Sequence, residues 1–353
     1  MLATSILEEH EQAVGASKSF KLKSSKLLQH MKRLRKSKNE SSAKLLEDEH
    51  LQADVKISYI DVGSETDHPV LNIQDFLRML GQCGQLDVLT GGLDLFKACQ
   101  EFWHRYSEED KSHPVFTVHA DHLNRCVPMC VYADEGQSHK KTSFMVLATQ
   151  PVIGKGTLAS LKRPGAESEM GANMAGSSLI TRFVFSCMSS TLYSKKPEVF
   201  DKLANELATQ LDAGFKDGIS VLYGGDETTL YPVVLYTKGD WPILKRLGAL
   251  NRTHPQAIAN LSESKGVCHL CMAGTEKYPD WHQCHQASWM CPESISDPRP
   301  PWSQQTLFTQ LLARSPSLWG KTWLYRPDLF HTVHKGVCAE LTGSGFATLD
   351  SSN

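Results

Sequence analysis

The sequence predicts an α/β domain in which three strands precede one long helix and a fourth strand follows it. Short apolar runs rich in β-branched residues recur between positions 115 and 240, and one amphipathic segment of helical period interrupts them. The composition, 41% hydrophobic and 22% charged residues, is that of an ordinary globular protein. At 353 residues the chain exceeds one average domain, so we expect an N-terminal extension and an insertion besides the main domain.

The first three strands are predicted from apolar runs that end at turn residues. Val127–Ala133 is followed by Asp-Glu-Gly, and Ser143–Thr149 comes after a polar turn, which together indicate a hairpin. A loop rich in Gly, Ala, Ser and Lys follows from 154 to 178, and Leu179–Met188 then resumes the strand signal.

The helix is predicted from large apolar residues three or four positions apart. They are Phe200, Leu203, Leu207, Leu211 and Phe215. Pro197 suits the first turn of this helix, and Gly218 suits its end. Because Tyr231–Thr237 is a further strand of the buried type, the predicted order is β-β-β-α-β. Asp134 follows the first strand of this series and Asp240 follows the fourth.

The whole chain divides into five parts by composition and periodicity. The predicted parts are a basic, largely disordered arm (1–55), a small helical subdomain (56–114), the α/β core (115–250), a Cys/His-rich insertion (251–300) and C-terminal helices (301–353). Nine Lys and Arg residues lie between Lys18 and Lys38, with no Asp or Glu among them. The candidate nucleic-acid contacts in this run are Lys32, Arg33, Arg35 and Lys36. A targeting signal or a solvated arm without a ligand is the alternative.

The carboxylates after the first and fourth strands are candidate ligands for divalent metal ions. If those strands are neighbours, Asp134 and Asp240 converge on one pair of ions. Hard oxygen ligands suit Mg²⁺ or Mn²⁺, and two such ions about 4 Å apart activate water and stabilise the leaving oxygen of a phosphodiester. The alternative is ordinary turn chemistry, in which Asp is common at strand ends.

A second candidate site lies in the insertion, where cysteine and histidine crowd together. Cys268 and Cys271 form a C-x2-C turn that presents two thiolates to one tetrahedral Zn²⁺. The other two ligands come from the set His282, Cys284, His285 and Cys291, among which the sequence does not choose. Reduced cysteines packed against tryptophan are the alternative. The ligands are too few for a RING-type ubiquitin ligase, and the motif pair of the zinc deaminases is missing.

A third feature is the D-x2-H sequence formed by Asp328 and His331. Pro327 suits the first turn of a helix, on which Asp328 and His331 lie one turn apart and can touch each other. A helix-capping aspartate and a surface histidine are the alternative interpretation of the same residues.

In this order the motifs resemble the ribonuclease-H-like catalytic domain of eukaryotic cut-and-paste transposases with a D-D-E triad, most of all the CACTA type. In that family a strand-end Asp precedes a C-x2-C knuckle and later a D-x2-H motif. Asp240, Cys268-His-Leu-Cys271 and Asp328-Leu-Phe-His331 match in that order, and the resemblance covers about residues 115 to 345. It implies a ribonuclease-H-like mixed sheet with flanking helices and a zinc-knuckle insertion.

The resemblance also implies a function, which is DNA strand cleavage and transfer that depends on Mg²⁺ or Mn²⁺, with Zn²⁺ in a structural role. The family's third acid usually lies well downstream of D-x2-H, whereas Glu340 is the only glutamate near that motif here. The expectations are therefore an enzyme that uses Glu340, or a truncated or domesticated remnant without activity. For such a remnant, the alternative function is non-catalytic binding of nucleic acid or chromatin.

We expect a protein that is neither secreted nor membrane-spanning. No apolar stretch approaches the roughly 20 residues of a membrane helix, and the N-terminus lacks the charged-then-apolar order of a signal peptide. Ten cysteines in so long a chain do not suggest a disulfide scaffold. The expected compartment is the nucleus or the cytoplasm, the expected partner is DNA, and self-association into a homo-oligomer is a further expectation.

Overall fold

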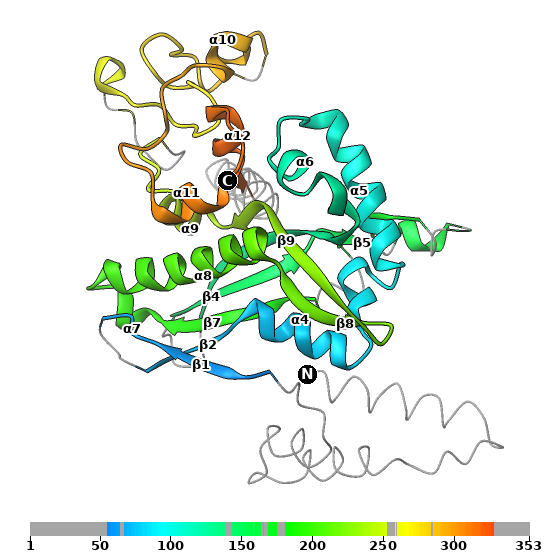
Figure 1. The fold of residues 1–353 in the computed structure, drawn as a ribbon. Coiled ribbons are helices and arrows are strands. Elements are labelled where there is room, and N and C mark those ends of the chain that lie inside the picture. The colour runs from blue at the N-terminus through cyan, green and yellow to red at the C-terminus, as the bar shows by residue number, and fades with distance from the viewer. Residues whose placement is uncertain are drawn as a thin grey trace, which may run out of the picture. The chain divides into compact units, whose positions relative to one another are not determined.

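A six-stranded mixed sheet organises the part of the chain that the computed structural model describes (Figure 1). That part runs from residue 55 to 327 and leaves out 64–66, 138–142, 158, 164, 166–168, 175–180, 253–257, 259 and 284. It belongs to one unit, Val55–Asn353. The α/β class predicted from the sequence is thereby confirmed.

The sheet has the strand order β10-β9-β3-β4-β7, and β8 pairs with β9. The strands are β3 (Cys126–Gln137), β4 (Ser143–Pro151), β7 (Phe183–Ser189), β8 (Ile219–Tyr223), β9 (Asp226–Gly239) and β10 (Tyr325–Pro327). β3, β9 and β10 are parallel to one another, whereas β4 is antiparallel to both β3 and β7, and β8 is antiparallel to β9. The first and fourth strands of the predicted series, β3 and β9, are therefore neighbours.

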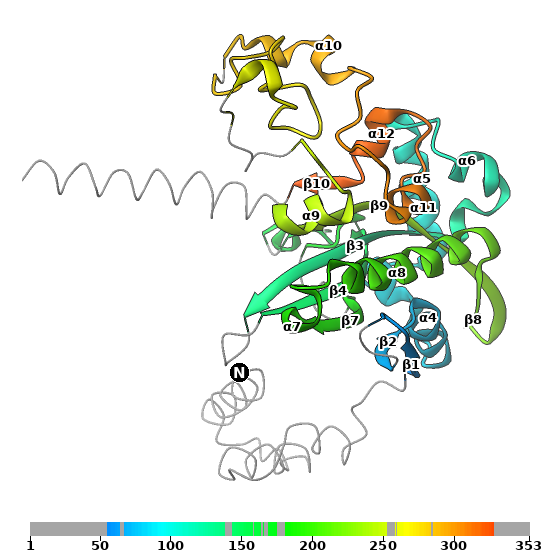
Figure 2. The same cartoon turned by 90° about the vertical axis from the view of Figure 1, so that its left-hand side faces the viewer.

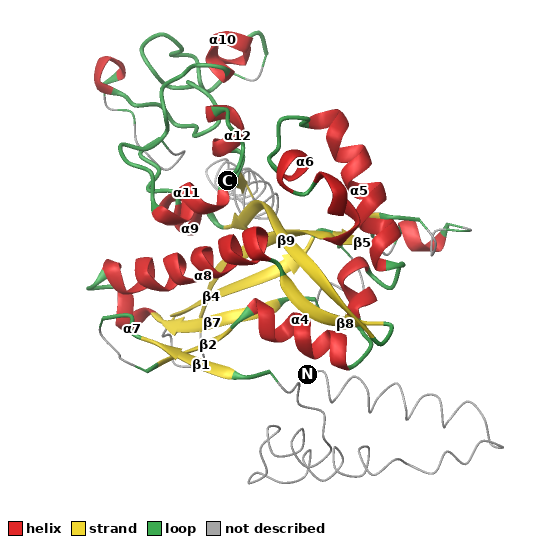
Figure 3. Cartoon of the chain, viewed as in Figure 1, coloured by secondary structure: helices red, strands yellow, loops and turns green. Residues whose placement is uncertain are grey.

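Helices flank the sheet, and Figure 3 sets them apart from the strands by colour. They are α4 (Ile73–Gln82), α5 (Leu95–Glu109), α6 (Val115–Val118), α7 (Ser190–Tyr193), α8 (Pro197–Asp217), α9 (Trp241–Leu247), α10 (Pro292–Ile295), α11 (Leu307–Leu312) and α12 (Leu318–Thr322). Two small antiparallel pairs accompany them, β1 (Ile57–Ile60) with β2 (His68–Leu71) and β5 (Ile153–Gly154) with β6 (Gly171–Ala172). Among the described helices, none has the length and apolar character needed to cross a membrane.

The long helix α8 has the bounds that the sequence predicts, because its ends carry strong local signals. Pro197 lies in its first turn, where the missing N–H is not needed. Gly218 follows its last residue with a φ of +75°, and a side chain there would clash with Thr229 on β9. Four residues of its apolar stripe, Phe200, Leu203, Leu207 and Leu211, are buried in the main core, and Phe215 is buried in a second, smaller cluster.

The strands differ from the prediction in their ends. β7 begins at Phe183 rather than Leu179, and the predicted strand Tyr231–Thr237 is the second half of the longer β9. Asp134 does not terminate its strand but lies inside β3, which continues to Gln137. β8 and β10 were not predicted, and Pro327, predicted to open a helix, is the last residue of β10.

The two faces of the sheet differ in polarity. Met129, Val131 and Ala133 of β3 are buried in the main core. Because side chains alternate along a strand, Tyr132 and Asp134 point to the opposite face. The region 56–114, predicted as a helical subdomain, contains β1 and β2 besides α4 and α5, and it adds Ile73, Leu77 and Leu95 to the same core.

Candidate functional site

The strand register brings Asp134 and Asp240 to the same place in the sheet. β3 and β9 lie side by side in the sheet (Figure 2) and pair in parallel. Ala133 lies opposite Gly239, and each aspartate is the next residue of its chain segment. Neighbouring strands lie about 4.8 Å apart, a separation that two carboxylates can bridge by binding the same ions. The register therefore makes the backbones of the two acids that the sequence singled out adjacent.

Asp134 lies among polar and charged side chains of the sheet face that carries it. Its Oδ2 accepts a hydrogen bond of 2.6 Å from the Tyr132 hydroxyl. Two cations flank the Tyr132 ring, with Arg182 Cζ at 4.8 Å and Lys238 Nζ at 5.7 Å from its centre. Lys238 Nζ also donates to Gln150 Oε1 at 2.7 Å. We call Asp134, Tyr132, Arg182, Lys238 and Gln150 the polar face.

Asp240 is fixed by the helix that it begins. Its Oδ1 accepts a hydrogen bond of 3.0 Å from the backbone N–H of Ile243, so the side chain caps α9. Gly239, directly before it, is required by the close approach of the strands, since a Cβ there would collide with the Ala133 carbonyl. The carboxylate thus has a defined position at the end of β9.

The third parallel strand reaches the same edge. β10 pairs with β9 so that Pro327 lies opposite Gly239. The next residue in the sequence is Asp328, which lies outside the described residues together with His331 and Glu340. The basic residues Lys32, Arg33, Arg35 and Lys36 also lie outside them.

The two cysteines of the C-x2-C turn interact electrostatically. The backbone N–H of Leu270 donates a hydrogen bond of 3.4 Å to the Cys268 sulfur. The interaction with the neighbouring Cys271 thiol is the main cause that lowers the pKa of Cys268 to about 6, and the same interaction raises the pKa of Cys271. Cys268 is therefore disposed to be a thiolate, which is the form that binds zinc.

The remaining candidate zinc ligands are not gathered around this pair. His282 and His285 are exposed, Cys291 is half-buried, and Cys284 lies outside the described residues. Within the described ranges no three His, Cys, Asp or Glu side chains form a group that could hold a metal ion. The structure thus brings together the first pair of predicted zinc ligands and leaves the second pair unassigned.

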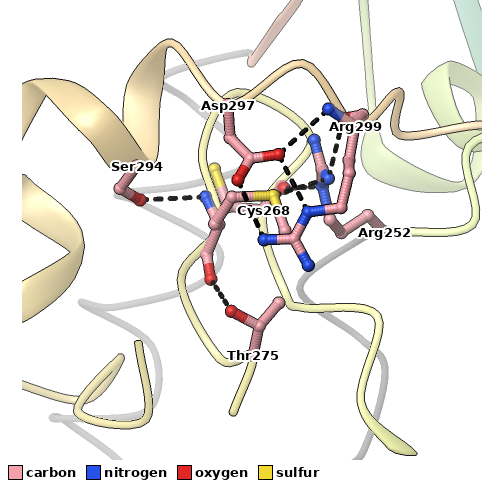
Figure 4. Close-up of polar contacts among 7 residues, drawn as sticks. Arg252, Cys268, Thr275, Ser294, Asp297 and Arg299 are labelled. Carbon is pink, nitrogen blue, oxygen red and sulfur yellow. Dashed lines mark hydrogen bonds and ion pairs between the residues drawn. The ribbon is translucent and has the colours of Figure 1, made fainter. Parts of the chain in front are cut away.

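A buried arginine fixes the backbone of the C-x2-C turn (Figure 4). Arg252, only 5% exposed, donates from Nε to the Cys268 carbonyl at 2.9 Å and from Nη1 to the Arg299 carbonyl at 3.1 Å. The side chains of Asp297 and Arg299 form an ion pair beside it, with N–O distances of 2.8 and 2.9 Å. These bonds hold the turn against the segment that follows α10.

His269, between the two cysteines, connects this turn to the sheet. It is fully buried, its Nε2 lies 2.6 Å from the Tyr325 carbonyl of β10, and its ring lies 5.1 Å from that of Trp241. Burial lowers the pKa of His269 to about 4, so the ring is neutral near pH 7. Since Trp241 follows Asp240, the C-x2-C turn supports the end of β9 that carries the candidate acid.

Sequence reasoning missed the side chains around the acids, although a simple signal marks two of them. Tyr132 lies two residues before Asp134, and Lys238 lies two residues before Asp240, the spacing that puts strand residues on one face. No such spacing in the sequence marks Arg182, because its approach to Tyr132 depends on how the strands pair in the sheet. No family model and no curated protein matches the chain.

Proposed function

We propose that the chain is a transposase-like protein with a ribonuclease-H-like core, which cleaves and transfers DNA strands with divalent metal ions. DNA is its partner and the nucleus its place of action. The observation that carries the proposal is the register of β3 and β9, which makes Asp134 and Asp240 neighbours. The strand directions support it, because β3 and β4 form an antiparallel pair while β3 and β9 are parallel.

The carboxylates of Asp134 and Asp240 suit Mg²⁺ or Mn²⁺, because these ions prefer carboxylate oxygens as ligands. Each carboxylate has two oxygens and several lone pairs, so Asp134 can keep its bond from Tyr132, and Asp240 its bond from Ile243, while each still binds a metal ion. A pair of ions held by these carboxylates would supply an activated water and would neutralise the leaving oxygen of a phosphodiester. In this proposal Glu340 completes the ligand set.

The chain's own residues orient the two carboxylates and bind the DNA substrate in this proposal. The Tyr132 hydroxyl holds the Asp134 carboxylate, and the first turn of α9 holds that of Asp240. Lys238 and Arg182 lie at the Tyr132 ring and can pair with backbone phosphates, which supply much of the affinity of proteins for DNA. The site thus combines two fixed carboxylates with nearby cations for the substrate.

The test is a nicking assay with the full chain, Mn²⁺ and a labelled DNA duplex. Asp134→Asn and Asp240→Asn keep the size of each side chain, and asparagine caps a helix as well as aspartate does. We expect each variant to lose nicking roughly 100-fold or more, since losing even an outer-shell partner of a metal ligand typically reduces activity about 10- to 100-fold.

Glu227→Gln is the matched control. Glu227 is an exposed residue at the start of β9, twelve positions before Gly239, and it accepts a hydrogen bond from the Ser220 hydroxyl. This variant should nick like the unmodified protein. Nicking that persists in both Asn variants would exclude the assigned site, and DNA binding without any nicking would favour the non-catalytic alternative.

A further inference from the structure

A cavity of about 680 Å³, whose lining includes neither Asp134 nor Asp240, lies between α5, the middle of β9 and the chain from α11 to β10. Small-molecule sites in proteins have volumes of this order. The lining side chains that matter below are Tyr106, Tyr236, Arg314, Ser317, Trp323 and Arg326. Figure 1 shows the elements that bring them together, α5, β9 and α12.

Arg314 is a buried cation with one donor to spare. Its side chain is 9% exposed, and its Nη2 lies 3.1 Å from Asp212 Oδ1. Its Cζ lies 3.7 Å from the centre of the Phe215 ring, so the guanidinium is held on two sides. Its Nε is buried and has no hydrogen-bond partner among the described residues. A buried N–H donor without a partner is unfavourable, and a ligand oxygen would satisfy it.

Arg326 repeats this arrangement on another wall of the same cavity. Its Cζ lies 4.6 Å from the ring centre of Tyr236 and 5.5 Å from that of Trp323. Its Nε is also buried without a hydrogen-bond partner in the described part of the chain. Stacking on the two rings leaves the edge of the guanidinium to donate. Two oriented guanidinium groups with unused donors therefore line one cavity.

The chemistry of the lining favours a nucleotide over a bare anion. Guanidinium edges match phosphate oxygens, and aromatic side chains such as Tyr106 and Trp323 offer surfaces for a base. Glu109 and Asp110 also line the cavity, and carboxylates would repel an isolated phosphate. The same carboxylates can accept hydrogen bonds from the amino groups of bases, as acidic side chains do in DNA recognition.

We infer that this cavity binds a nucleotide, with its phosphate on Arg314 and Arg326 and its base against the aromatic lining. The inference rests on the proposed function, because the expected source is a nucleotide turned out of the DNA strand. Tyr236 precedes Asp240 by four residues on β9, about 13 Å along a strand. A DNA strand spans that distance in about four nucleotides at 3.4 Å each. A free nucleotide offers the same chemistry.

Calorimetric titration of the full chain in EDTA tests the inference without requiring cleavage. The probes are deoxyadenosine monophosphate, deoxyadenosine and inorganic phosphate. We expect the monophosphate to bind more tightly than either fragment. Arg326→Gln should weaken the monophosphate about tenfold or more and weaken deoxyadenosine much less, because the charge that the substitution removes faces the phosphate. Arg326→Lys keeps the charge but lacks the planar guanidinium group. Its affinity for the monophosphate should lie between those of the unmodified chain and Arg326→Gln.

Arg246→Gln is the matched control, since Arg246 also stacks over aromatic rings, Tyr193 and Phe200, but does not line the cavity. It should bind the monophosphate normally, as should the Asp134→Asn, Asp240→Asn double variant. If a single-stranded oligonucleotide displaces the monophosphate, the site binds a nucleotide of a DNA strand. If the oligonucleotide does not displace it, the site binds a free nucleotide. No binding of the monophosphate, or equal binding by Arg326→Gln, would overturn the inference whatever the outcome of the nicking assay.

Discussion

At the scale of single residues, Asp240 serves two purposes that are compatible. Its Oδ1 caps α9, which fixes the carboxylate, while the group keeps further lone pairs for a metal ion. Replacement by alanine would remove both the cap and the charge and would destabilise the helix by about 1 kcal/mol. Asparagine removes only the charge. A functional loss in Asp240→Asn is therefore evidence about chemistry rather than folding.

His113 is a single residue that makes the free energy of unfolding depend on pH. It is 5% exposed, and its Nδ1 accepts a hydrogen bond of 3.2 Å from the backbone N–H of Val115, which requires the neutral ring. Burial lowers the pKa of His113 from 6.5 to about 4. Below pH 6.5 the unfolded chain binds a proton that the folded chain excludes, so stability is complete above pH 6.5 and is lost as pH falls toward 4.

The measurement is the free energy of unfolding in urea between pH 4 and 6.5. One histidine contributes a slope of up to about 1.4 kcal/mol per pH unit in this window. His113→Asn should reduce the slope by about that amount, whereas His104→Asn, at an exposed position of α5, should leave it unchanged. An unaltered slope in His113→Asn would show that this histidine is not buried in its neutral form.

At the scale of elements, the sequence could predict those with strong local signals. α8 has five apolar residues at helical spacing, a proline at its start and a glycine after its end, so both its type and its bounds are correct. β8 had a signal that was overlooked, since Gly224-Gly225 between two strand-like runs is typical of a hairpin. β10 had none, because three residues ending in Pro327 form a strand only beside β9.

The sequence could predict the two acids of the candidate site but not all of the side chains around them. Asp134 and Asp240 could be paired because the element order makes neighbours of their strands once a sheet forms. Arg182 and Gln150 could not, because their approach to Tyr132 and Lys238 depends on the register, which shifts between Met129 and Cys130 and between Leu147 and Ala148. Such irregularities arise from packing and leave no periodic trace in the sequence.

The C-x2-C turn yields a prediction for the insertion. If Cys268 and Cys271 bind a structural Zn²⁺, elemental analysis should find about one zinc ion per chain. The Cys268→Ser, Cys271→Ser double variant should lose it, while Cys83→Ser, Cys187→Ser, at two exposed cysteines, should retain it. Because thiolates bind the metal, zinc should also be lost as pH falls below neutral.

Limited proteolysis provides the second measurement for the insertion. Residues 251–300 contain few regular elements, so metal binding would supply much of their local stability. A chelator should expose cleavage sites there while β3 and β9 stay protected. A zinc-free protein with an insertion that resists protease equally with and without chelator would show that the cysteines are packing residues.

At the scale of the whole molecule, charge is unevenly distributed along the chain. The protein has 37 Lys and Arg against 39 Asp and Glu. Nine of the basic residues lie in Lys18–Lys38, so 28 basic and 39 acidic residues lie in the rest of the chain. The net charge of the rest is therefore 28 − 39 = −11. A chain whose remainder is this acidic would need the basic run to attract DNA.

Binding to DNA should therefore depend on the basic run and on salt. Replacing Lys32, Arg33, Arg35 and Lys36 by glutamine should weaken binding to all sequences alike. It should also flatten the plot of log affinity against log salt by about 0.9 for each phosphate that is no longer neutralised, or about 3.6 for four phosphates. Fluorescence anisotropy with a labelled duplex at several salt concentrations measures both effects. An unchanged slope would make the run a targeting signal or inert.

The measurement that tests the central claim most directly is the binding of Mn²⁺ itself, followed by electron paramagnetic resonance of the free ion. It requires neither cleavage nor knowledge of a DNA sequence. The account predicts that Asp134→Asn and Asp240→Asn each weaken Mn²⁺ binding about tenfold or more, because each removes a charged oxygen ligand from the edge formed by β3 and β9. Glu227→Gln, at the other end of β9, should bind Mn²⁺ like the unmodified chain. Equal Mn²⁺ affinity in all four proteins would contradict the assignment of a metal centre to these two aspartates.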